Sequence, residues 1–299
     1  MLSSRLRTTL PVFLLVLHLS GLPAVATPAA PIKVMTYNVL YDDTNFRNTQ
    51  IWHTRKKDVA RVMGSADIIG TQEPLFSQVQ YLKSALPGYH VIGVGNQDGK
   101  KKGLFCAIFY RTDTFRVLKS GTFWLSPQPD QPGSRGWDAQ SLRIVTWAQF
   151  KAVAHGHVFF VFNTHFDHRS KRARVESARL LLDRIDTIAE NASVLVVGDF
   201  NTQTGTSAYR ILTQNGHSPL RNAYDLTAIS KRHGPRWTFV KKFKQGGKGK
   251  RWIDFILARG PRLHFEQHTI IDQKAAYGGY PSDHLPVMAT FTILPHEAE

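Results

Sequence analysis

The chain has 299 residues and carries 38 Lys and Arg against 22 Asp and Glu, which gives a formal net charge of +16 at pH 7. This basic balance favours polyanionic partners, namely nucleic acid, phosphorylated small molecules or an anionic surface, without choosing among them. The single cysteine, Cys106, excludes an internal disulfide. We therefore expect a hydrophobic core to hold the fold together, with Cys106 as a buried apolar residue in it.

The first 26 residues have the pattern of a secretory signal peptide. Arg5 and Arg7 precede an apolar segment at 11–22, and the small residues at 24–26 supply a cleavage site. The apolar segment is shorter than the roughly 20 residues that a membrane-spanning helix needs, so a cleaved signal is favoured over an uncleaved anchor. We expect a signal peptide at 1–26 and one domain at 27–299 of a secreted or periplasmic monomer, without stable membrane insertion.

Short apolar segments rich in Val, Ile, Phe and Thr predict strands at 32–40, 67–71, 89–94, 104–111, 115–124, 143–154, 158–165, 194–198, 251–258 and 286–293. Segments 158–162 and 194–197 are continuously apolar, which is typical of strands covered on both faces. Apolar residues three and four apart predict a helix at 170–190, with weaker helical patterns at 51–64, 76–86 and 208–215. Loops are predicted at 130–138 and 241–250. Because strands and helices are interspersed, we expect a mixed α/β fold with sheets covered by helices.

Polar side chains recur at the ends of the predicted strands: Asn38, Glu73, His165, Asp199, Asn201, Asp254, Asp283 and His284. Strand ends that carry polar side chains toward one edge are a common way for a sheet to present a site. Carboxylates beside amide and imidazole groups are the material of a metal-assisted phosphate site.

The spacing of these residues adds geometric expectations. Asp199 and Asn201 are two residues apart and share one face if the strand continues through them. Asp283 and His284 are adjacent, so both reach one site only if the turn around them is irregular. Asp254 sits inside an apolar strand, where a carboxylate is costly to bury unless a cation, a histidine or a metal partners it.

The Gly-Asp-Phe-Asn run at 198–201 and the Ser-Asp-His run at 282–284 resemble motifs of the endonuclease/exonuclease/phosphatase superfamily. The other strand-end residues come in that family's order, so the resemblance covers nearly all of 27–299. It implies a four-layered α/β sandwich, in which two mixed β-sheets pack face to face with helices outside. It also implies metal-dependent hydrolysis of a phosphoester by in-line attack of water, without a covalent intermediate.

The resemblance assigns binding roles to single residues. Glu73, Asn38 and Asp283 are the implied metal ligands, and their hard oxygen atoms suit Mg²⁺ or Mn²⁺. Asn201 is implied to hold the phosphate. Arg143 is similar to an arginine that faces the phosphate in many bacterial members, with a plain sheet-edge arginine as the alternative.

Four further residues carry implied catalytic roles. His284 is similar to the family's catalytic histidine, and Asp254 to the acid that orients it. Asp199 positions or deprotonates the attacking water, and His165 is a phosphate-binding or acid histidine. The resemblance leaves open whether His284 or Asp199 is the general base.

The substrate stays open, because this active site is shared across the family while its substrates differ. Basic runs at 169–174 and 241–251 are placed to hold a nucleic-acid backbone or a polyphosphate, or are exposed solubilising loops. We expect a nuclease acting on nucleic acid, with a phosphatase of a sugar phosphate or inositol phosphate as the alternative. A sphingomyelinase-type lipid phosphodiesterase ranks third, and a catalytically inactive binding protein would have lost a core site residue. We expect Asp167 and His168 to be solvated turn residues rather than a second metal site.

Overall fold

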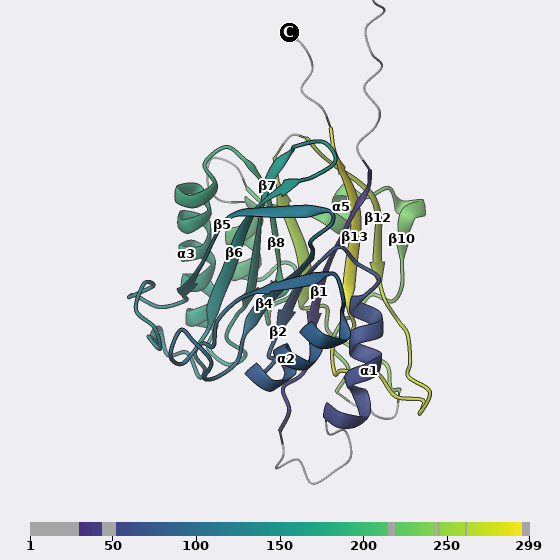
Figure 1. The fold of residues 1–299 in the computed structure, drawn as a ribbon. Coiled ribbons are helices and arrows are strands. Elements are labelled where there is room, and N and C mark those ends of the chain that lie inside the picture. The colour runs from purple at the N-terminus through teal and green to yellow at the C-terminus, as the bar shows by residue number, and fades with distance from the viewer. Residues whose placement is uncertain are drawn as a thin grey trace, which may run out of the picture.

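The computed structural model describes residues 30–43, 52–214, 219–241, 243, 246–260 and 262–294 (Figure 1). The predicted signal peptide at 1–26 lies outside these residues. Within them, no helix combines the length and the apolar character needed to cross a membrane.

The main strands are β1 Ile32–Asn38, β2 Ile68–Gln72, β3 Tyr89–Ile92, β4 Cys106–Arg111, β5 Phe115–Trp124, β6 Ile144–Ala152, β7 Val158–His165, β8 Ser193–Asp199, β11 Asp254–Arg259, β12 Leu263–Ile270 and β13 Val287–Ile293. Two short strands are β9 Arg221–Asn222 and β10 Arg232–His233. The helices are α1 Trp52–Met63, α2 Phe76–Ala85, α3 Lys171–Ala189, α4 Ser207–Gln214, α5 Ala223–Leu226 and the 3₁₀ turn η1 Ile229–Lys231.

The strands form two mixed sheets. The seven-stranded sheet has the order β10-β12-β13-β1-β2-β4-β3, and the six-stranded sheet has the order β5-β6-β7-β8-β11-β9. In the first sheet β1 pairs in parallel with β2 and antiparallel with β13. In the second, β7 and β8 are parallel while β8 and β11 are antiparallel. The central strands of both sheets therefore end at one common edge of the molecule.

Three hydrophobic clusters separate four layers of structure. Between the sheets, Val34 and Ile68 of one pack with Val161 and Leu195 of the other. On the outer face of the seven-stranded sheet lie α1 and α2, and α3 and α4 cover the outer face of the six-stranded sheet (Figure 1). Burying one such aliphatic side chain stabilises the fold by about 1.5–3 kcal/mol. The expected four-layered sandwich is confirmed.

Helix α3 shows how the sequence pattern produces its element. The Ser170 hydroxyl accepts a hydrogen bond from the Ala173 amide at 3.0 Å, which caps the helix where it begins. Leu181 and Ile185 are fully buried against the six-stranded sheet, while the opposite face of α3 is charged. The periodicity that predicted a helix at 170–190 is thus the periodicity of a packed face.

Two sheet predictions need correction. Strand β12 was not predicted, because its exposed positions hold His264 and Gln267 and a register shift between Phe265 and Gln267 breaks its alternation. The strand expected at 251–258 begins at Asp254, so this carboxylate opens the strand rather than lying inside it.

A buried polar network fastens the two sheets together close to the common strand edge. The Asn163 amide of β7 donates to the carbonyls of Thr71 and Ala107, both at 2.9 Å, and accepts from Gln72 at 2.7 Å. A Cβ on Gly70 would lie 2.4 Å from Val197, so the sheets approach closely only because residue 70 is glycine. This contact holds the ends of β2 and β7 in a fixed relation.

Candidate active site

Three site candidates stand side by side at the end of the six-stranded sheet. His165 of β7 is the register partner of Asp199 of β8, and Asp199 is the partner of Asp254 of β11. Register partners on neighbouring strands present their side chains on the same face of the sheet. The His165 Nε2 atom lies 3.3 Å from the Asp199 Oδ2 atom. Strand pairing alone therefore assembles this row.

His284 reaches the row from the other sheet. Its Nδ1 atom lies 2.8 Å from Asp254 Oδ2, and its Nε2 atom lies 3.7 Å from Asp199 Oδ2. The preceding segment is irregular, with the His284 amide donating to the Ser282 hydroxyl at 3.3 Å and β13 beginning only at Val287. This irregular turn lets both Asp283 and His284 line the same cavity, as their adjacency required.

Asn38 and Glu73 complete the site from the seven-stranded sheet. The Asn38 Nδ2 atom donates to Glu73 Oε1 and to Asp199 Oδ2, both at 3.1 Å, so one amide joins the carboxylates of the two sheets. The backbone of Glu73 has φ 74°, a left-handed conformation that costs a non-glycine residue on the order of 1 kcal/mol. Such strain, over-determined by its surroundings, is typical of functional positions.

The charges in this row depend on each other. Burial acts to raise the pKa of Asp199, but His165 and His284 outweigh burial and hold this pKa below its usual range. Burial acts to lower the pKa of His284, but Asp254 and Asp199 hold it well above the usual histidine value. Burial also raises the pKa of Asp254, with Asp199 reinforcing this shift and His284 opposing it.

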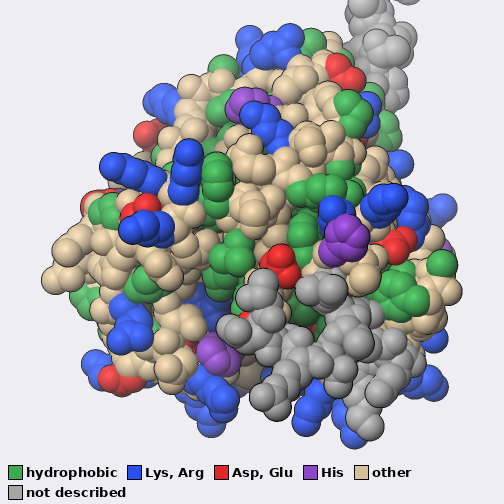
Figure 2. Space-filling model, turned by 60° about the horizontal axis from the view of Figure 1, so that its bottom comes forward, with side chains coloured by type: hydrophobic (Ala, Val, Ile, Leu, Met, Phe, Trp, Pro, Cys, Tyr) green, Lys and Arg blue, Asp and Glu red, His purple; other side chains and the backbone are tan. Residues whose placement is uncertain are grey.

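The site residues open into a cavity of about 540 Å³ whose walls carry opposite charge. Its lining holds the carboxylates of Glu73, Asp199 and Asp283 as well as basic side chains, namely Arg143, Arg169, Arg251, His165 and His168. Figure 2, which brings this end of the molecule forward, shows many Lys and Arg side chains over the same face and few Asp and Glu. Arg143 is buried and its Nη2 atom lies 3.3 Å from His168 Nδ1, so it belongs to the cavity wall rather than to an exposed sheet edge.

Asn201 reaches the cavity by a route other than the expected one. Strand β8 ends at Asp199, and Asn201 has a left-handed backbone with φ 48°. The strand does not continue through Asn201, so the condition for a shared strand face is not met. The turn instead lets the Asn201 amide N–H donate to Asp199 Oδ1 at 2.9 Å and brings the side-chain Nδ2 to 3.0 Å from His165 Nε2.

Asp167 is a structural residue, and the prediction that it is solvated is wrong. It is buried, and its carboxylate accepts four backbone N–H groups: those of Gln140, Ser141, Arg169 and Ser170, at 2.7–3.0 Å. With its lone pairs occupied in this way, it holds the 140–141 loop against the start of α3. His168 is exposed, as expected of a turn residue, but lines the cavity.

Sequence reasoning missed Arg55, which is fully buried under the site. Its guanidinium donates to the carbonyls of Val39 and Leu40, and to those of Pro281 at 3.2 Å and Tyr41 at 3.4 Å. Arg55 therefore joins the segment after Asn38 to the segment before Asp283. One signal could have revealed it: residue 55 falls on the apolar face of α1 with Trp52 and Val59.

The carboxylate and amide oxygens of the candidate site fit a divalent cation. Burial, opposed by His284 and reinforced by Glu73 and Asp199, raises the pKa of Asp283 to about 6. A nearby cation relieves such repulsion, and carboxylate and amide oxygens are its preferred ligands. Asp199, Asp254 and His284 also bring ligand atoms within 4.8 Å of one another, but His284 Nδ1 is already engaged by Asp254.

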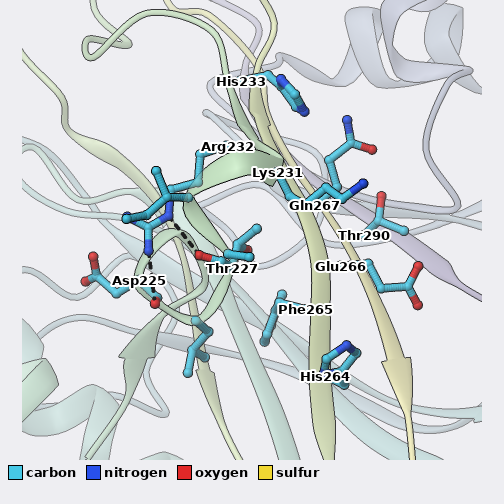
Figure 3. A pocket seen from close by; sticks show the side chains of 13 residues that line it. Asp225, Thr227, Lys231, Arg232, His233, His264, Phe265, Glu266, Gln267 and Thr290 are labelled. Carbon is cyan, nitrogen blue, oxygen red and sulfur yellow. Dashed lines mark hydrogen bonds between the residues drawn. The ribbon is translucent and has the colours of Figure 1, made fainter.

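A larger cavity of about 890 Å³ lies away from this site, where α5 and η1 cross β12 (Figure 3). Acidic side chains (Asp225 and Glu266) and basic ones (Lys231, His233 and His264) line it together, so its lining does not favour a ligand of either charge. Its Arg232 is already bonded to the carbonyls of Thr227 and Asp225. None of the predicted site residues lines this cavity.

Comparison with known proteins places the fold in one family. A structure from Bacteroides vulgatus, described as an endonuclease/exonuclease/phosphatase, is 35% identical and has a TM-score of 0.81, with 89% of this chain and 100% of that chain covered. A mannosyl-6-phosphatase from Bacteroides thetaiotaomicron is 34% identical with a TM-score of 0.80, covering 88% of this chain and 100% of that one.

More distant sequence relatives are longer proteins. Nocturnin of Drosophila melanogaster is 23% identical over 219 residues, which are 64% of this chain and 33% of that protein. The chain spans about a third of the length of the curated relatives it matches. Residues 35–284 match the model of the Endonuclease/Exonuclease/phosphatase family, and the chain belongs to that family.

Proposed function

We propose that this protein is a divalent-metal-dependent phosphatase that hydrolyses the phosphate monoester of a sugar. The observation that carries the proposal is a cavity whose lining combines the carboxylates of Glu73, Asp199 and Asp283 with Arg143, Arg169 and Arg251. A phosphate dianion between a bound cation and arginines is neutralised from both sides. The volume of about 540 Å³ falls in the range of small-molecule sites. The 34% identity to a mannosyl-6-phosphatase supports a sugar phosphate over other monoesters.

In this proposal the chain's own residues bind the phosphate and move the protons. Arg143 and Asn201 hold phosphate oxygens beside His165. Asp199, which His165 and His284 keep ionised, accepts the proton of the attacking water. The N–H at His284 Nε2 gives its proton to the sugar oxygen as the bond from that oxygen to phosphorus breaks, and the proton on Asp199 then passes to Nε2, which lies 3.7 Å away. Asp254 holds His284 in place through Nδ1, so that Nε2 faces the reacting groups. A cation held by Glu73, Asp283 and Asn38 supplies charge neutralisation at a phosphate oxygen when bound.

A second candidate is the hydrolysis of a nucleic-acid phosphodiester, which the basic sequence first suggested. The observation in its favour is that Arg169 lines the cavity and is followed by exposed Lys171 and Arg172, a continuous basic exit from the site. The small-molecule size of the cavity and the likeness to a mannosyl-6-phosphatase favour the monoester, so we place the nuclease second.

A substrate panel with Mg²⁺ and with EDTA tests both candidates. We expect phosphate release from mannose 6-phosphate or glucose 6-phosphate that exceeds turnover of DNA, RNA, inositol phosphates and sphingomyelin, and that EDTA abolishes. Asp199→Asn should remove this activity, whereas the exposed Asp183→Asn on α3 should keep it. Faster cleavage of an oligonucleotide than of any sugar phosphate would overturn the first proposal in favour of the second.

The metal assignment has a test that does not depend on turnover. Glu73→Gln should weaken the binding of Mn²⁺ measured by calorimetry, because it removes a charged oxygen ligand. The same measurement on Asp183→Asn should give the wild-type affinity. Equal Mn²⁺ affinity in all three proteins would remove Glu73 from the site.

We also propose that the chain is exported, on the strength of the segment at 1–26. N-terminal sequencing of protein recovered outside the cytoplasm should begin at Thr27. Recovery only of a chain that still begins at Met1 would contradict export by this signal.

A further inference from the structure

A second cavity, of about 700 Å³, adjoins the catalytic one. Phe239, Lys241, the segment 247–250 and Arg251 line it. Phe239 and Arg251 also line the catalytic cavity, so these two side chains form the wall between the cavities. The two cavities therefore adjoin at Phe239 and Arg251.

The glycine-rich segment that lines the second cavity is packed in place. The amides of Thr238 and Phe239 donate to the Arg251 carbonyl at 2.8 and 3.0 Å, which pairs the segment with 237–239. A Cβ on Gly249 would lie 2.3 Å from the Phe239 carbonyl and 2.4 Å from the Trp237 ring, so only glycine fits there. Lys248 and Lys250, on either side of Gly249, are therefore attached to a backbone segment that is packed in place.

The described residues that line the second cavity carry four formal positive charges and no negative one. Lys241, Lys248, Lys250 and Arg251 are exposed, and no acidic residue is in its described lining. Among the described residues, none of these four cations forms an ion pair within the chain. The Arg251 guanidinium instead lies 4.3 Å above the Phe239 ring, which in turn packs 5.2 Å from the His284 ring. The charges thus remain available to an anion, and the two rings connect this cavity to the catalytic histidine.

We propose that this second cavity is a subsite for a second phosphate group of the substrate, so that the enzyme prefers a sugar bisphosphate to the corresponding monophosphate. The inference rests on the proposed phosphatase function. One phosphate occupies the catalytic cavity, the sugar crosses the wall of Phe239 and Arg251, and the second phosphate meets Lys241, Lys248 and Lys250. The same cations would also attract the next phosphate of a polynucleotide, so the experiment includes that source.

The test compares a hexose 1,6-bisphosphate with a hexose 6-phosphate on the full protein and two triple variants. The subsite variant is Lys241→Gln/Lys248→Gln/Lys250→Gln. The control is Lys57→Gln/Lys83→Gln/Lys119→Gln, which changes the net charge equally at exposed positions on α1, α2 and β5. We expect the subsite variant to lose about tenfold in kcat/KM on the bisphosphate, mostly through KM, as three exposed charge contacts would supply. Its kcat on the monophosphate should stay unchanged, and the control should behave as wild type.

Two outcomes would overturn the inference: equal kcat/KM of the wild type on both sugars, or an equal loss in both triple variants. A terminally phosphorylated oligonucleotide preferred over the bisphosphate would overturn the sugar assignment of the subsite. Calorimetric binding to Asp199→Asn separates this inference from the proposed function, because it needs no turnover. Tighter binding of bisphosphate without any hydrolysis by the wild type would sink the phosphatase proposal alone, and hydrolysis without a binding preference would sink the subsite alone.

Discussion

Arg55→Met should destabilise the protein and disable its active site together, although Arg55 touches none of the proposed catalytic groups. Methionine keeps much of the arginine stem and removes the guanidinium that bonds four backbone carbonyls. Arg55 is fully buried, so water cannot replace these bonds. A hydrogen bond to a charged group contributes roughly 1.5–3 kcal/mol, and losing the two bonds to Val39 and Leu40 should cost about 3–5 kcal/mol.

Thermal unfolding followed by circular dichroism measures this cost. For a domain of this size the expected loss lowers Tm by about 10 °C. Activity should fall even at temperatures where Arg55→Met is folded, because the carbonyls of Leu40 and Pro281 flank Asn38 and Asp283. The control is Arg61→Met on the exposed face of α1, whose ion pair with Asp58 is worth less than about 1 kcal/mol. A Tm for Arg55→Met within the error of the Arg61→Met value would refute the role of Arg55 in joining the segments after Asn38 and before Asp283.

Three further predictions concern single buried residues. Asp254→Asn should lower kcat by about a hundredfold or more, since His284 loses the acid that orients it; a kcat like that of Asp183→Asn would contradict this. His268 is buried without a hydrogen-bond partner for its ring among the described residues, and burial lowers its pKa to about 4. Because the unfolded histidine binds a proton near pH 6.5, the wild type loses stability as pH falls from about 6.5 toward 4, and His268→Phe should avoid about 2 kcal/mol of that loss at pH 5 relative to pH 8. Parallel urea curves for both proteins at the two pH values check the sign, and an equal pH dependence would contradict it. Asp167→Ala should cost about 2–4 kcal/mol in urea unfolding, because four backbone N–H groups lose their acceptor, and a change below about 0.5 kcal/mol would show that the carboxylate is dispensable.

The strands and the polar residues at their ends could be predicted because short runs of neighbouring residues carry the signal for both. Continuous apolar runs marked β7 and β8 as strands covered on both faces, and the polar residues that follow such runs lie at one edge by necessity of pairing. His165 and Asp199 came together for this reason. A pattern carried by a few neighbouring residues can be recognised without knowledge of distant contacts.

What escaped prediction depends on contacts between distant segments. Strand β12 exposes polar side chains and contains a register shift, so its alternation is legible only beside β13. Asp167 looked solvated because its partners at 140–141 are remote in sequence. The left-handed backbone of Glu73 depends on the site around it, and the presence of a glutamate in the sequence does not predict this conformation.

The candidate active site is divided between the two sheets: Asn38 ends β1, Glu73 follows β2 and His284 precedes β13, whereas Asp199 and Asp254 belong to β8 and β11. Neither sheet holds a working half, because the bonds from Asn38 to Asp199 and from His284 to Asp254 cross the sandwich. During refolding, recovery of activity must therefore wait for the sheets to dock, however early their helices and hairpins form. The time course of recovered activity then reports when the two sheets dock. A spectroscopic signal from α3 that recovers earlier would reveal an intermediate in which the sheets have not yet docked.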